Sequence, residues 1–515
     1  MNLASCIWLF LFVLTCHGAN VLVYNGARIA QSHVFFMAKI ADVLQEDGHN
    51  VTFYQQEVFK SVNKVGVRKA KAVVRKADED LGGEPNQDVW HPPEGLVANL
   101  KMFKAYGNAI TKACEFQLND KEYLAKLKAE KYDIALIEYF DICGFAIVEQ
   151  LGIPKWITTS AMMIQSDFNS LFGHPKNLAF VPGFDGDHGS RLTYKQRVKA
   201  FFSYPLQKIM YYLVFGEGAH GVVRRMGQKF HYEDVIARSS YVFINVDEHL
   251  AFQMPLSEKM IYIGGMDQDA VTKPLEKEFS TIYNNAKKGV ILVSFGTIAK
   301  SVDMPEEKKQ DVLSLVRNFP EYEFIWKYEG DDAVGKELKN LHKRKWLPQS
   351  DLLAHLKTLA FVTHGGLNSF SEAAHRGMPV VCVPLFADQA NNCYSGAEKG
   401  LGIVVKKEDF SGKRLIEAVD ELLHNSTYKQ RSVHFARMMA AKPFKPKDRI
   451  TGYVNHALEF DVNMALDLPS RHLSFIQLYF IDVIVPLVLL LVLFVYIIVK
   501  VSKFLFKFVK KVKVE

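Results

Sequence analysis

Cysteine is scarce in this sequence: there are 6 cysteines among 515 residues, and no two of them have C-x-x-C spacing. This excludes a small disulfide-stapled scaffold and a zinc ribbon. Glycine (32) and proline (18) are too few for a fibrous chain, and a hydrophobic content of 49% is too high for intrinsic disorder. The composition therefore predicts a globular protein of about two or three domains.

Basic charge is also missing from most of the chain. The net charge is +7, but residues 500–515 hold six lysines and one glutamate, which is +5 and leaves +2 for the other 499 residues. A protein that binds the phosphate backbone of nucleic acids needs a basic surface. We therefore expect no nucleic-acid partner.

The first apolar run, Ile7 to Leu14, lies near the N-terminus. It is too short to cross a hydrocarbon core of ~30 Å. Small residues at Cys16 and Gly18 suit a cleavage site, so residues 1–18 are predicted to be a signal peptide. A buried strand or an uncleaved anchor is the alternative.

The second apolar run predicts a membrane anchor. Residues 478–499 carry no charge apart from Asp482 near one end, and this run is long enough for one transmembrane helix. The basic tail, 500–515, would then be cytosolic, which makes the protein single-pass type I with lumenal domains. Lys511 and Lys513 resemble a dilysine retrieval signal of the endoplasmic reticulum membrane. A buried core helix is the alternative.

Strand and helix patterns alternate between these ends in two series, which predicts parallel βαβ units. We expect an N-terminal domain over 19–265, a linker over 266–288 and a C-terminal domain over 289–470, each a doubly wound α/β domain. The ligand should lie in the cleft between them, at the carboxyl ends of the strands. The charged stretch 57–93 is expected to be an irregular insertion. Strands are expected at 21–24, 50–54, 134–137, 155–158, 241–245, 290–295, 323–326, 360–363 and 380–383.

Three smaller signals complete this survey. Gly216 to Gly221 matches G-x-G-x-x-G, but a helical pattern precedes it where a dinucleotide site needs a strand, so a connecting loop is expected. Asn50 and Asn425 begin glycosylation sequons that a lumenal domain could use. The sequence does not say whether any of the four cysteines beyond the signal are paired.

The most informative region lies between residues 345 and 392. Residues 363–368, T-H-G-G-L-N, form a glycine-containing turn from a strand into a helix, whose N-terminus suits a diphosphate. Several polar and aromatic side chains accompany this turn. They are side-chain donors, a carboxylate on the same helix face, an aromatic ring, an amide, and a further acid–amide pair that is expected to end a strand at the cleft. Each has a structural alternative, as a capping histidine, a core aromatic or a solvated helix residue. The donors are His364, Asn368 and Ser369, the carboxylate is Glu372, the ring is Trp346, the amide is Gln349, and the acid–amide pair is Asp388 with Gln389.

The ordered combination of W-L-P-Q, T-H-G-G-x-N-S-x-x-E and P-x-x-x-D-Q resembles the donor-binding signature of the UDP-glycosyltransferase family, most closely its membrane-anchored animal branch, the UDP-glucuronosyltransferases. The likeness covers nearly the whole chain. It implies a GT-B fold, with two Rossmann-like domains facing a cleft and one C-terminal transmembrane helix. It also implies inverting transfer of a sugar, glucuronic acid first among the candidates, to a small lipophilic acceptor.

Carried over by position, the resemblance implies a role for each donor-site residue. No metal and no cofactor are expected, because the helix dipole and a histidine would stabilise the departing UDP, and the UDP-sugar is a co-substrate. The implied contacts are Trp346 and Gln349 with uracil, Ser294, Thr297, His364, Asn368 and Ser369 with the diphosphate, Glu372 with ribose, and Asp388 and Gln389 with the sugar.

The resemblance also implies that His33 is the general base, a role that suits histidine near neutral pH. The family pairs this histidine with an aspartate, but the aligned residue here is Glu138, and Asp141 follows three positions later. Either acid is therefore a candidate partner. Alternatives to this activity are a UDP-glucosyltransferase and a non-catalytic lumenal binding protein on the same scaffold, and the chain could form a homo-oligomer.

Overall fold

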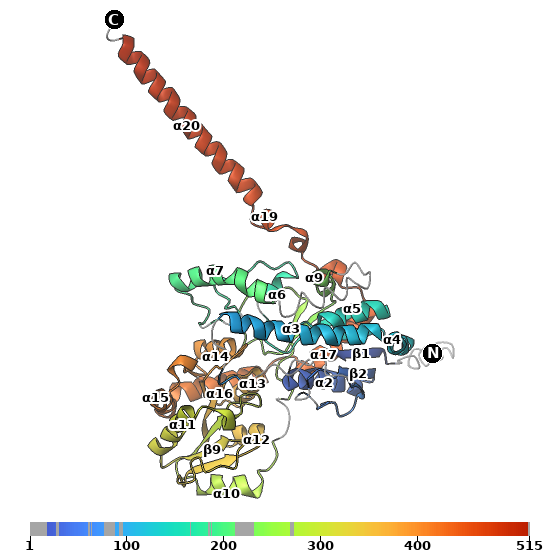
Figure 1. The fold of residues 1–515 in the computed structure, drawn as a ribbon, viewed down its shortest axis with the longest axis vertical. Coiled ribbons are helices and arrows are strands. Elements are labelled where there is room, and N and C mark those ends of the chain that lie inside the picture. Colours follow the sequence, from blue (N-terminus) through green and yellow to red (C-terminus); the bar gives the residue numbers. More distant parts are fainter. Residues whose placement is uncertain are drawn as a thin grey trace, which may run out of the picture.

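The computed structural model describes residues 18–26, 30–59, 62, 64–76, 88–91, 96–164, 166–183, 186, 188–211, 231–267 and 272–512. Two α/β bodies lie one above the other, and a long helix leaves one end (Figure 1). The predicted signal sequence up to residue 17 and the G-x-G-x-x-G segment lie outside the described residues.

The first body contains a seven-stranded parallel sheet in the order β3-β2-β1-β4-β5-β6-β7. The chain therefore reverses its direction of winding between β1 and β4, as in a doubly wound fold. The strands are β1 (Asn20–Asn25), β2 (Asn50–Gln56), β3 (Lys71–Arg75), β4 (Ile134–Glu138), β5 (Trp156–Ser160), β6 (Val242–Ile244) and β7 (Met260–Tyr262).

Strand β3 corrects one expectation from the sequence. It lies inside the stretch 57–93 that was expected to be irregular, and it pairs in parallel with β2 at the sheet edge. Three of its five residues are exposed and none is fully buried, so it has no apolar run or alternation to reveal it.

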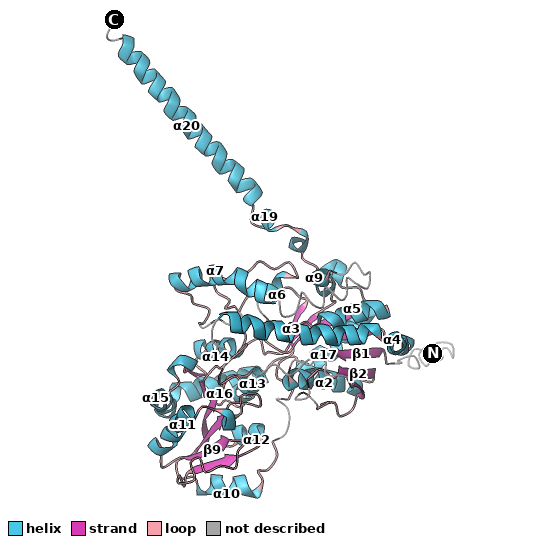
Figure 2. Ribbon diagram, in the orientation of Figure 1, coloured by secondary structure: helices cyan, strands magenta, loops and turns pink. Residues whose placement is uncertain are grey.

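Helices cover both faces of this sheet (Figure 2). Helix α2 packs on the sheet through apolar side chains that recur at helical spacing and are buried. The helices are α2 (Gln31–Glu46), α3 (Leu96–Asn119), α4 (Lys121–Ala129), α5 (Ile142–Leu151), α6 (Ser166–Ser170), α7 (Tyr194–Tyr211) and α9 (Tyr232–Ala237).

The second body repeats the plan with six parallel strands in the order β10-β9-β8-β11-β12-β13. Its winding reverses between β8 and β11. The strands are β8 (Val290–Ser294), β9 (Glu323–Lys327), β10 (Leu341–Arg344), β11 (Thr358–Thr363), β12 (Val380–Cys382) and β13 (Gly402–Val404). Two doubly wound domains and an apolar C-terminal helix are the fold predicted from the sequence.

The second body has its own helical layers. The segment expected as a linker, 266–288, includes helix α10, whose Tyr283 hydroxyl is 2.8 Å from Thr358 Oγ1 in the second body. The helices are α10 (Lys277–Asn285), α11 (Glu306–Asn318), α12 (Gln349–Ala354), α13 (Leu367–His375), α14 (Gln389–Glu398), α15 (Gly412–His424) and α16 (Ser426–Ala440), with short 3-10 turns at Ser301–Asp303 and Lys407–Asp409.

Helix α17 (Pro446–Glu459) returns to the first body. Its Ile450, Val454 and Ala457 are buried in the hydrophobic cluster that also contains residues of α2. Lys155 Nζ, at the start of β5, donates to the carbonyls of Ala457 and Leu458 at 2.7 and 2.8 Å. The C-terminal part of the chain therefore ties the two bodies together.

The chain then leaves the body through α18 (Asn463–Leu466), a 3-10 turn (Pro469–His472), α19 (Phe475–Leu478) and α20 (Ile481–Val512). Within α20, residues 481–507 are long and apolar enough to cross a membrane, and their apolar side chains are exposed. The helix does not end at residue 499, so lysines of the basic tail continue it.

The four cysteines beyond the signal form two disulfides, which the sequence left open. Cys114 of α3 is bonded to Cys143 of α5, and Cys382 of β12 to Cys393 of α14. Both pairs join a helix to a neighbouring element of the same body. Each therefore limits how far that helix can move.

Candidate functional site

The carboxyl ends of the central strands bring the predicted site residues together. In the first sheet Tyr24 of β1 pairs with Ile137 of β4, so the segments after both strands leave from one point. In the second sheet Ser294 of β8 pairs with Thr363 of β11 in the same way. Ligands of doubly wound sheets bind at these reversal points.

His33 lies in the first turn of α2 and is buried beside the end of β4. Its Nδ1 is 2.6 Å from Oε1 of Glu138, which is itself 3% exposed. Burial alone would lower the pKa of His33, but the charge and hydrogen bond of Glu138, with a smaller contribution from Asp388, raise it above 6.5. A histidine held by a carboxylate on one nitrogen presents the other nitrogen to a ligand.

The second acidic candidate has a different contact. Asp141 is the N-cap of α5, and its Oδ1 accepts a hydrogen bond from the Gly144 amide at 2.9 Å. Such a cap satisfies one of the amide groups that a helix start leaves unpaired. Glu138 is therefore the acid in contact with His33, although the sequence could not choose between the two.

The loop after β11 forms the facing part of the site. Gly365 has a positive φ of 80°, and the N-cap of α13 is Gly366, so no side chain caps the first turn of that helix. The amide groups of this turn can therefore meet an anion. A Cβ on Gly296, in the loop after β8, would lie 2.6 Å from the His364 ring, so the two loops are in close contact.

His364 is electrostatically unlike His33. Burial in the cleft, with the positive charge of Lys327 as the lesser cause, lowers the pKa of His364 to about 4. Lys327 Nζ donates to the Gly296 carbonyl at 2.9 Å and pairs with Glu329. His364 is therefore neutral near pH 7, with a lysine held behind the loop.

The residues predicted for uracil and ribose lie in neighbouring helices. Gln349, at the start of α12, donates through Nε2 to Glu372 Oε2 at 2.8 Å and to Ser369 Oγ at 3.1 Å. Burial raises the pKa of Glu372, against the hydrogen bond from Gln349. The Trp346 ring is 66% exposed, with Lys64 Nζ of the first body 5.7 Å from its centroid. Trp346 is therefore mostly accessible to a ligand.

Asp388 and Gln389 are not at the end of a strand, as expected, because β12 ends at Cys382 and Asp388 is instead the N-cap of α14. Gln389 Oε1 accepts from the amides of Leu385 and Phe386 at 2.8 and 3.1 Å, which leaves its amide nitrogen for a ligand. Burial raises the pKa of Asp388, against a hydrogen bond from Asn392 and the charge of His33. The interaction with His33 brings residues of the two bodies together across the cleft.

Asn392 and the Cys382–Cys393 disulfide are parts of the site that the sequence did not single out. Asn392 Nδ2 is 3.0 Å from both the Gly365 carbonyl and Asp388 Oδ2. A Cβ on Gly365 would lie 2.2 Å from Cys393 Sγ and 2.6 Å from Cys382 Sγ, so the disulfide packs directly against this loop. The signal that could have found them is their position within four residues of the P-x-x-x-D-Q motif, residues 384–389.

The remaining predicted residues lie around the same loops. Ser294 is buried and accepts a hydrogen bond from the Gly296 amide at 3.4 Å, whereas Thr297 is exposed. Asn368 is exposed in the first turn of α13, where Asn245 of the first body donates to its side-chain oxygen at 3.4 Å. Of the ten predicted donor residues, Ser294 ends β8 and Glu372 lies in the middle of α13, and the other eight belong to loops and helix starts that follow strands of the second body.

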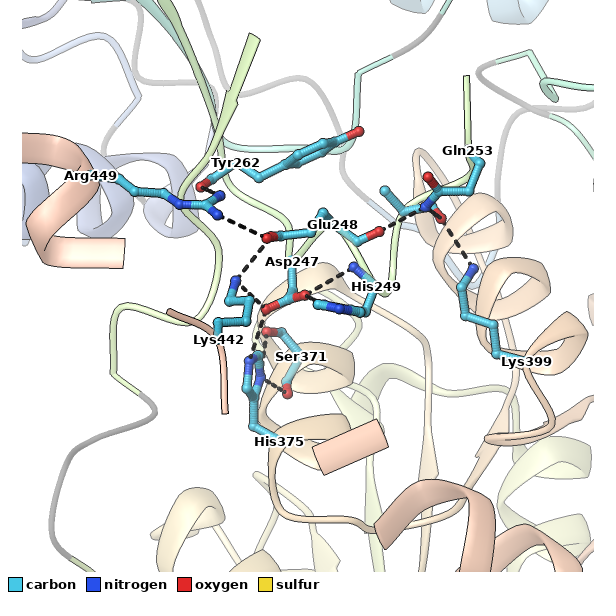
Figure 3. A network of polar contacts seen from close by, with 11 residues as sticks. Asp247, Glu248, His249, Gln253, Tyr262, Ser371, His375, Lys399, Lys442 and Arg449 are labelled. Atoms are coloured by element: carbon cyan, nitrogen blue, oxygen red, sulfur yellow. Dashed lines mark hydrogen bonds and ion pairs between the residues drawn. The ribbon is translucent and has the colours of Figure 1, made fainter. Parts of the chain in front are cut away.

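A buried polar network joins the two bodies next to this site (Figure 3). Asp247, in the loop after β6, is fully buried and lies 2.7 Å from Lys442 Nζ and 3.7 Å from Nε2 of His375, the last residue of α13. Burial would raise the pKa of Asp247, but the nearby His375 and the positive charge of Lys442 outweigh burial and hold the pKa far below its usual value. The network therefore connects α13 to the first body.

This network also contains a group, within the described part of the chain, with metal-ligand spacing: Asp247, Glu248 and His249. The carboxylates of Asp247 and Glu248 already have cationic partners: in addition to the contact of Lys442 with Asp247, Lys442 Nζ lies 2.9 Å from Glu248 and Arg449 Nη2 lies 3.1 Å from Glu248. These contacts fit an ion-pair network between domains better than a cation site.

The two sequon asparagines lie on the surface, away from these loops. Asn50 is the exposed first residue of β2, and its Nδ2 donates to Asn20 Oδ1 at 2.8 Å. Asn425 is exposed and is the N-cap of α16, where its Oδ1 accepts from the Thr427 amide at 3.1 Å. Their glycosylation stays a prediction.

Comparison with known protein families gives a match over nearly the whole chain. The model of the family described as "UDP-glucoronosyl and UDP-glucosyl transferase" matches residues 19–515. The match includes both bodies, the loops described above and the C-terminal helix.

Curated relatives are similar over the same range. A putative UDP-glucuronosyltransferase, ugt-47 of Caenorhabditis elegans, is 28% identical over 91% of this chain and 89% of its own length. The human 2-hydroxyacylsphingosine 1-beta-galactosyltransferase is 26% identical over 93% of this chain and 87% of its own length. Relatives of this chain thus carry names for different sugars.

Solved structures support the fold. A UDP-glucose: anthocyanidin 3-O-glucosyltransferase in complex with UDP aligns with a TM-score of 0.58 and 14% identity, over 86% of this chain and 99% of that one. The glycotransferase of kitacinnamycin aligns with a TM-score of 0.56 and 15% identity, over 85% of this chain and 99% of that one. The neighbours are GT-B glycosyltransferases, so this chain has the two-domain GT-B fold.

Proposed function

The chain belongs to this family of UDP-sugar glycosyltransferases, and we propose that it transfers glucuronic acid from UDP-glucuronate, with inversion at the anomeric carbon, to a small lipophilic acceptor. The observation that carries the proposal is the 2.6 Å contact between His33 and Glu138, opposite a helix start that suits a diphosphate. Names of relatives such as ugt-47 favour glucuronate as the sugar.

In the proposed reaction, the acceptor hydroxyl gives its proton to Nε2 of His33, because Nδ1 faces the Glu138 carboxylate. The acceptor oxygen then bonds to the anomeric carbon as the bond from that carbon to the diphosphate oxygen breaks. UDP leaves with the electron pair. Glu138 would stabilise the imidazolium and hold the ring in the reactive tautomer.

On the donor side, the amides at the start of α13 and the side chains of His364 and Ser294 would bind the diphosphate. Glu372 would accept from the ribose hydroxyls, and the Trp346 ring would stack on uracil. Asp388 and the Gln389 amide would hold the sugar next to His33. Because these groups already offset the charge of the leaving UDP, the proposal needs neither a metal nor a cofactor.

The proposed lipophilic acceptor is supported by aromatic residues beside the base. The Phe140 ring lies 6.0 Å from the His33 ring and 3.8 Å from the Tyr139 ring. The Phe168 ring lies 4.5 Å from the Tyr139 ring, and the Phe172 ring lies 5.5 Å from the Phe168 ring. Such rings favour an apolar acceptor through area burial and ring stacking.

We also propose that the protein is a single-pass type I protein of the endoplasmic reticulum membrane, with both α/β bodies in the lumen. The apolar helix and the lysines that follow it support this orientation. In microsomes, the full-length chain should stay in the pellet after alkaline carbonate extraction, and its bodies should resist protease until the membrane is opened. Release by carbonate would contradict the anchor, and cleavage in intact microsomes would contradict the orientation.

Turnover in microsomes is the direct test of the proposed activity. A mixed panel of phenols should be converted with UDP-glucuronate faster than with UDP-glucose or UDP-galactose. The galactosyltransferase among the relatives makes UDP-galactose a necessary arm. Faster turnover with a neutral sugar would replace glucuronate and keep the family activity.

The alternative, a binding protein without turnover, makes a different prediction. It would bind UDP normally yet convert no acceptor with any of the three donors. The variant His33→Ala distinguishes the two functions, because only an enzyme loses an activity when its base is removed.

A further inference from the structure

Helix α7 has its apolar side outward, unlike an ordinary surface helix. Its residues Gln196, Ala200, Ser203 and Tyr204 are partly buried and face the body. The opposite side has an apolar residue at each helical repeat, and its rings are largely exposed: Tyr194 by 73%, Phe201 by 68% and Phe202 by 72%. The whole apolar face consists of Tyr194, Val198, Phe201, Phe202, Leu206 and Ile209.

An exposed face of this kind marks a contact with another phase or molecule, because soluble surfaces rarely gather large apolar side chains. By helical position Lys199 borders the apolar face of α7, and Lys195 lies within that face in the first turn. Aromatic and aliphatic side chains flanked by lysine are typical of helices that lie in the plane of a membrane interface.

The position of α7 in the molecule favours a bilayer as the occupant. In Figure 1, α7 forms the edge of the globular body from which α19 and α20 leave. The residues around α19 are also exposed and apolar, including Phe475 and Phe480. Two apolar surfaces therefore lie on the side of the body that faces the predicted membrane span.

The segment that leads to α20 is fixed to the first body, so the body does not swing freely beneath the membrane. Asp467 pairs with the buried Lys259 and, at 2.5 Å, with Arg471. Ser470 Oγ donates to the Gly173 carbonyl at 2.5 Å. From Arg471 to Ile481 the chain can reach at most about 35 Å.

Helix α7 is joined to the same anchored region. Lys176 Nζ lies 4.4 Å from the centre of the Tyr204 ring of α7 and 3.9 Å from Asp167 Oδ1 of α6. Helix α6 leads directly into the turn at Gly173 that Ser470 contacts. Helix α7 and the segment that enters the membrane therefore contact the same region of the first body, between α6 and Lys176.

We propose that the apolar face of α7 inserts into the leaflet on the side of the globular body, as a second membrane contact in addition to α20. This contact would hold the first body against the bilayer. It rests on the proposed membrane anchor, and the test below separates the two.

Single tryptophans in the full-length protein test this contact. Phe202→Trp on α7, Phe494→Trp in α20 and Leu356→Trp, at a 96% exposed apolar site after α12, would be reconstituted into phosphatidylcholine vesicles. One set of vesicles carries bromine on the acyl chains near the ester groups, at the depth expected for α7, a second set carries it near the chain ends, at the depth expected for Phe494, and a third set carries none. Emission of the parent protein is subtracted. Phe202→Trp and Phe494→Trp should lose emission to bromine, and Leu356→Trp should not.

Every other outcome of the quenching experiment also decides whether the α7 contact and the α20 anchor stand. Quenching of Phe494→Trp without Phe202→Trp overturns the α7 contact and leaves the anchor standing. Quenching of Phe202→Trp alone supports the α7 contact and contradicts the anchor, and no quenching of either contradicts both. If the Phe202→Trp emission ignores bromine but shifts to shorter wavelength as the protein-to-lipid ratio rises, the face binds a second copy of this chain, which overturns the proposal. Phe201→Trp repeats the measurement at a neighbouring site.

Discussion

Each body contributes a histidine next to a helix start at the cleft, and the two have opposite electrostatics. His33 is 2.6 Å from a carboxylate, which outweighs burial and raises its pKa above 6.5. His364 has Lys327 nearby instead, and burial lowers its pKa to about 4. The same side chain is thus prepared for two kinds of chemistry by its neighbours alone.

The difference fits the two halves of the proposed reaction. A histidine paired with an acid can accept a proton and hold the resulting charge, as a general base must. A neutral histidine at a helix start can meet a diphosphate, whose charge would then favour protonation. Exchanging these surroundings, or removing either ring, should therefore have distinct effects.

The largest expected effect comes from His33→Ala. Loss of the base should lower kcat for phenols by ~10²–10⁴-fold. Dissociation of UDP, measured by calorimetry, should be unchanged because its proposed site is in the other body. Equal losses in turnover and in UDP affinity would show that His33 supports the fold of the cleft and is not its base.

Glu138→Gln should have the next largest effect, since it removes the charge and keeps the shape. We expect turnover to fall by roughly 10²-fold. His33 must be neutral to accept a proton, so the wild-type rate should rise with pH through a pKa above 6.5. Without the Glu138 charge, burial dominates, so this limb of the pH–rate profile should move to lower pH.

The matched control for that variant is Asp141→Ser, which keeps an acceptor at the N-cap of α5. Its pH–rate profile should stay like that of the wild type. Full activity in Glu138→Gln together with a dead Asp141→Asn would transfer the acidic role to Asp141. Unchanged activity in both would remove the dyad from the mechanism.

On the other side of the comparison, Glu372→Ala should weaken UDP binding. The ribose hydroxyls would lose a charge-assisted acceptor worth roughly 1.5–3 kcal/mol, or about 10- to 150-fold in Kd. Asp388→Ala should leave UDP binding intact and impair sugar transfer. Intact UDP-sugar kinetics in both variants would show that the donor roles have been assigned to the wrong residues.

The smallest expected effect concerns the protonation of His364. With a free pKa of about 4 it is neutral at pH 6, and the diphosphate charge should raise the pKa, so binding of UDP-glucose should take up protons. Calorimetry at about pH 6 in two buffers with different ionisation enthalpies measures this uptake. His364→Gln should abolish the uptake and weaken binding by about tenfold, the value of one charge-assisted hydrogen bond. The uptake should persist in His33→Gln; its loss there would assign the proton to the wrong histidine.

Much of this arrangement could be predicted from the sequence. The predicted strands at 21–24, 134–137, 290–295 and 360–363 are confirmed as β1, β4, β8 and β11, because buried parallel strands are short apolar runs. Helix α10 was missed inside the expected linker, because a polar stretch with three buried side chains resembles a loop. Strand β3 was missed because edge strands carry no strong apolar pattern.

The loop between β11 and α13 could be predicted from the sequence because the residues that define it are close together in the chain. A strand, a turn with two glycines and a helix start lie within ten residues, so the prediction of an anion site around His364 needs only local backbone geometry. The sequence alone indicates no role for Asn392, which follows the P-x-x-x-D-Q motif by three residues. Its bridge between Gly365 and Asp388 depends on how α14 packs beside the loop.

The sequence by itself determined the two α/β series, the apolar C-terminal helix and the order of the donor motif, since each depends on residues close together in the chain. Only the tertiary structure decided that Glu138, 105 positions from His33, contacts it while Asp141 caps a helix. It also decided the two disulfides, the return of α17 to the first body and the outward apolar face of α7. Contacts between distant residues depend on packing, where a shift of one helical turn replaces one neighbour with another, and no local pattern records that choice.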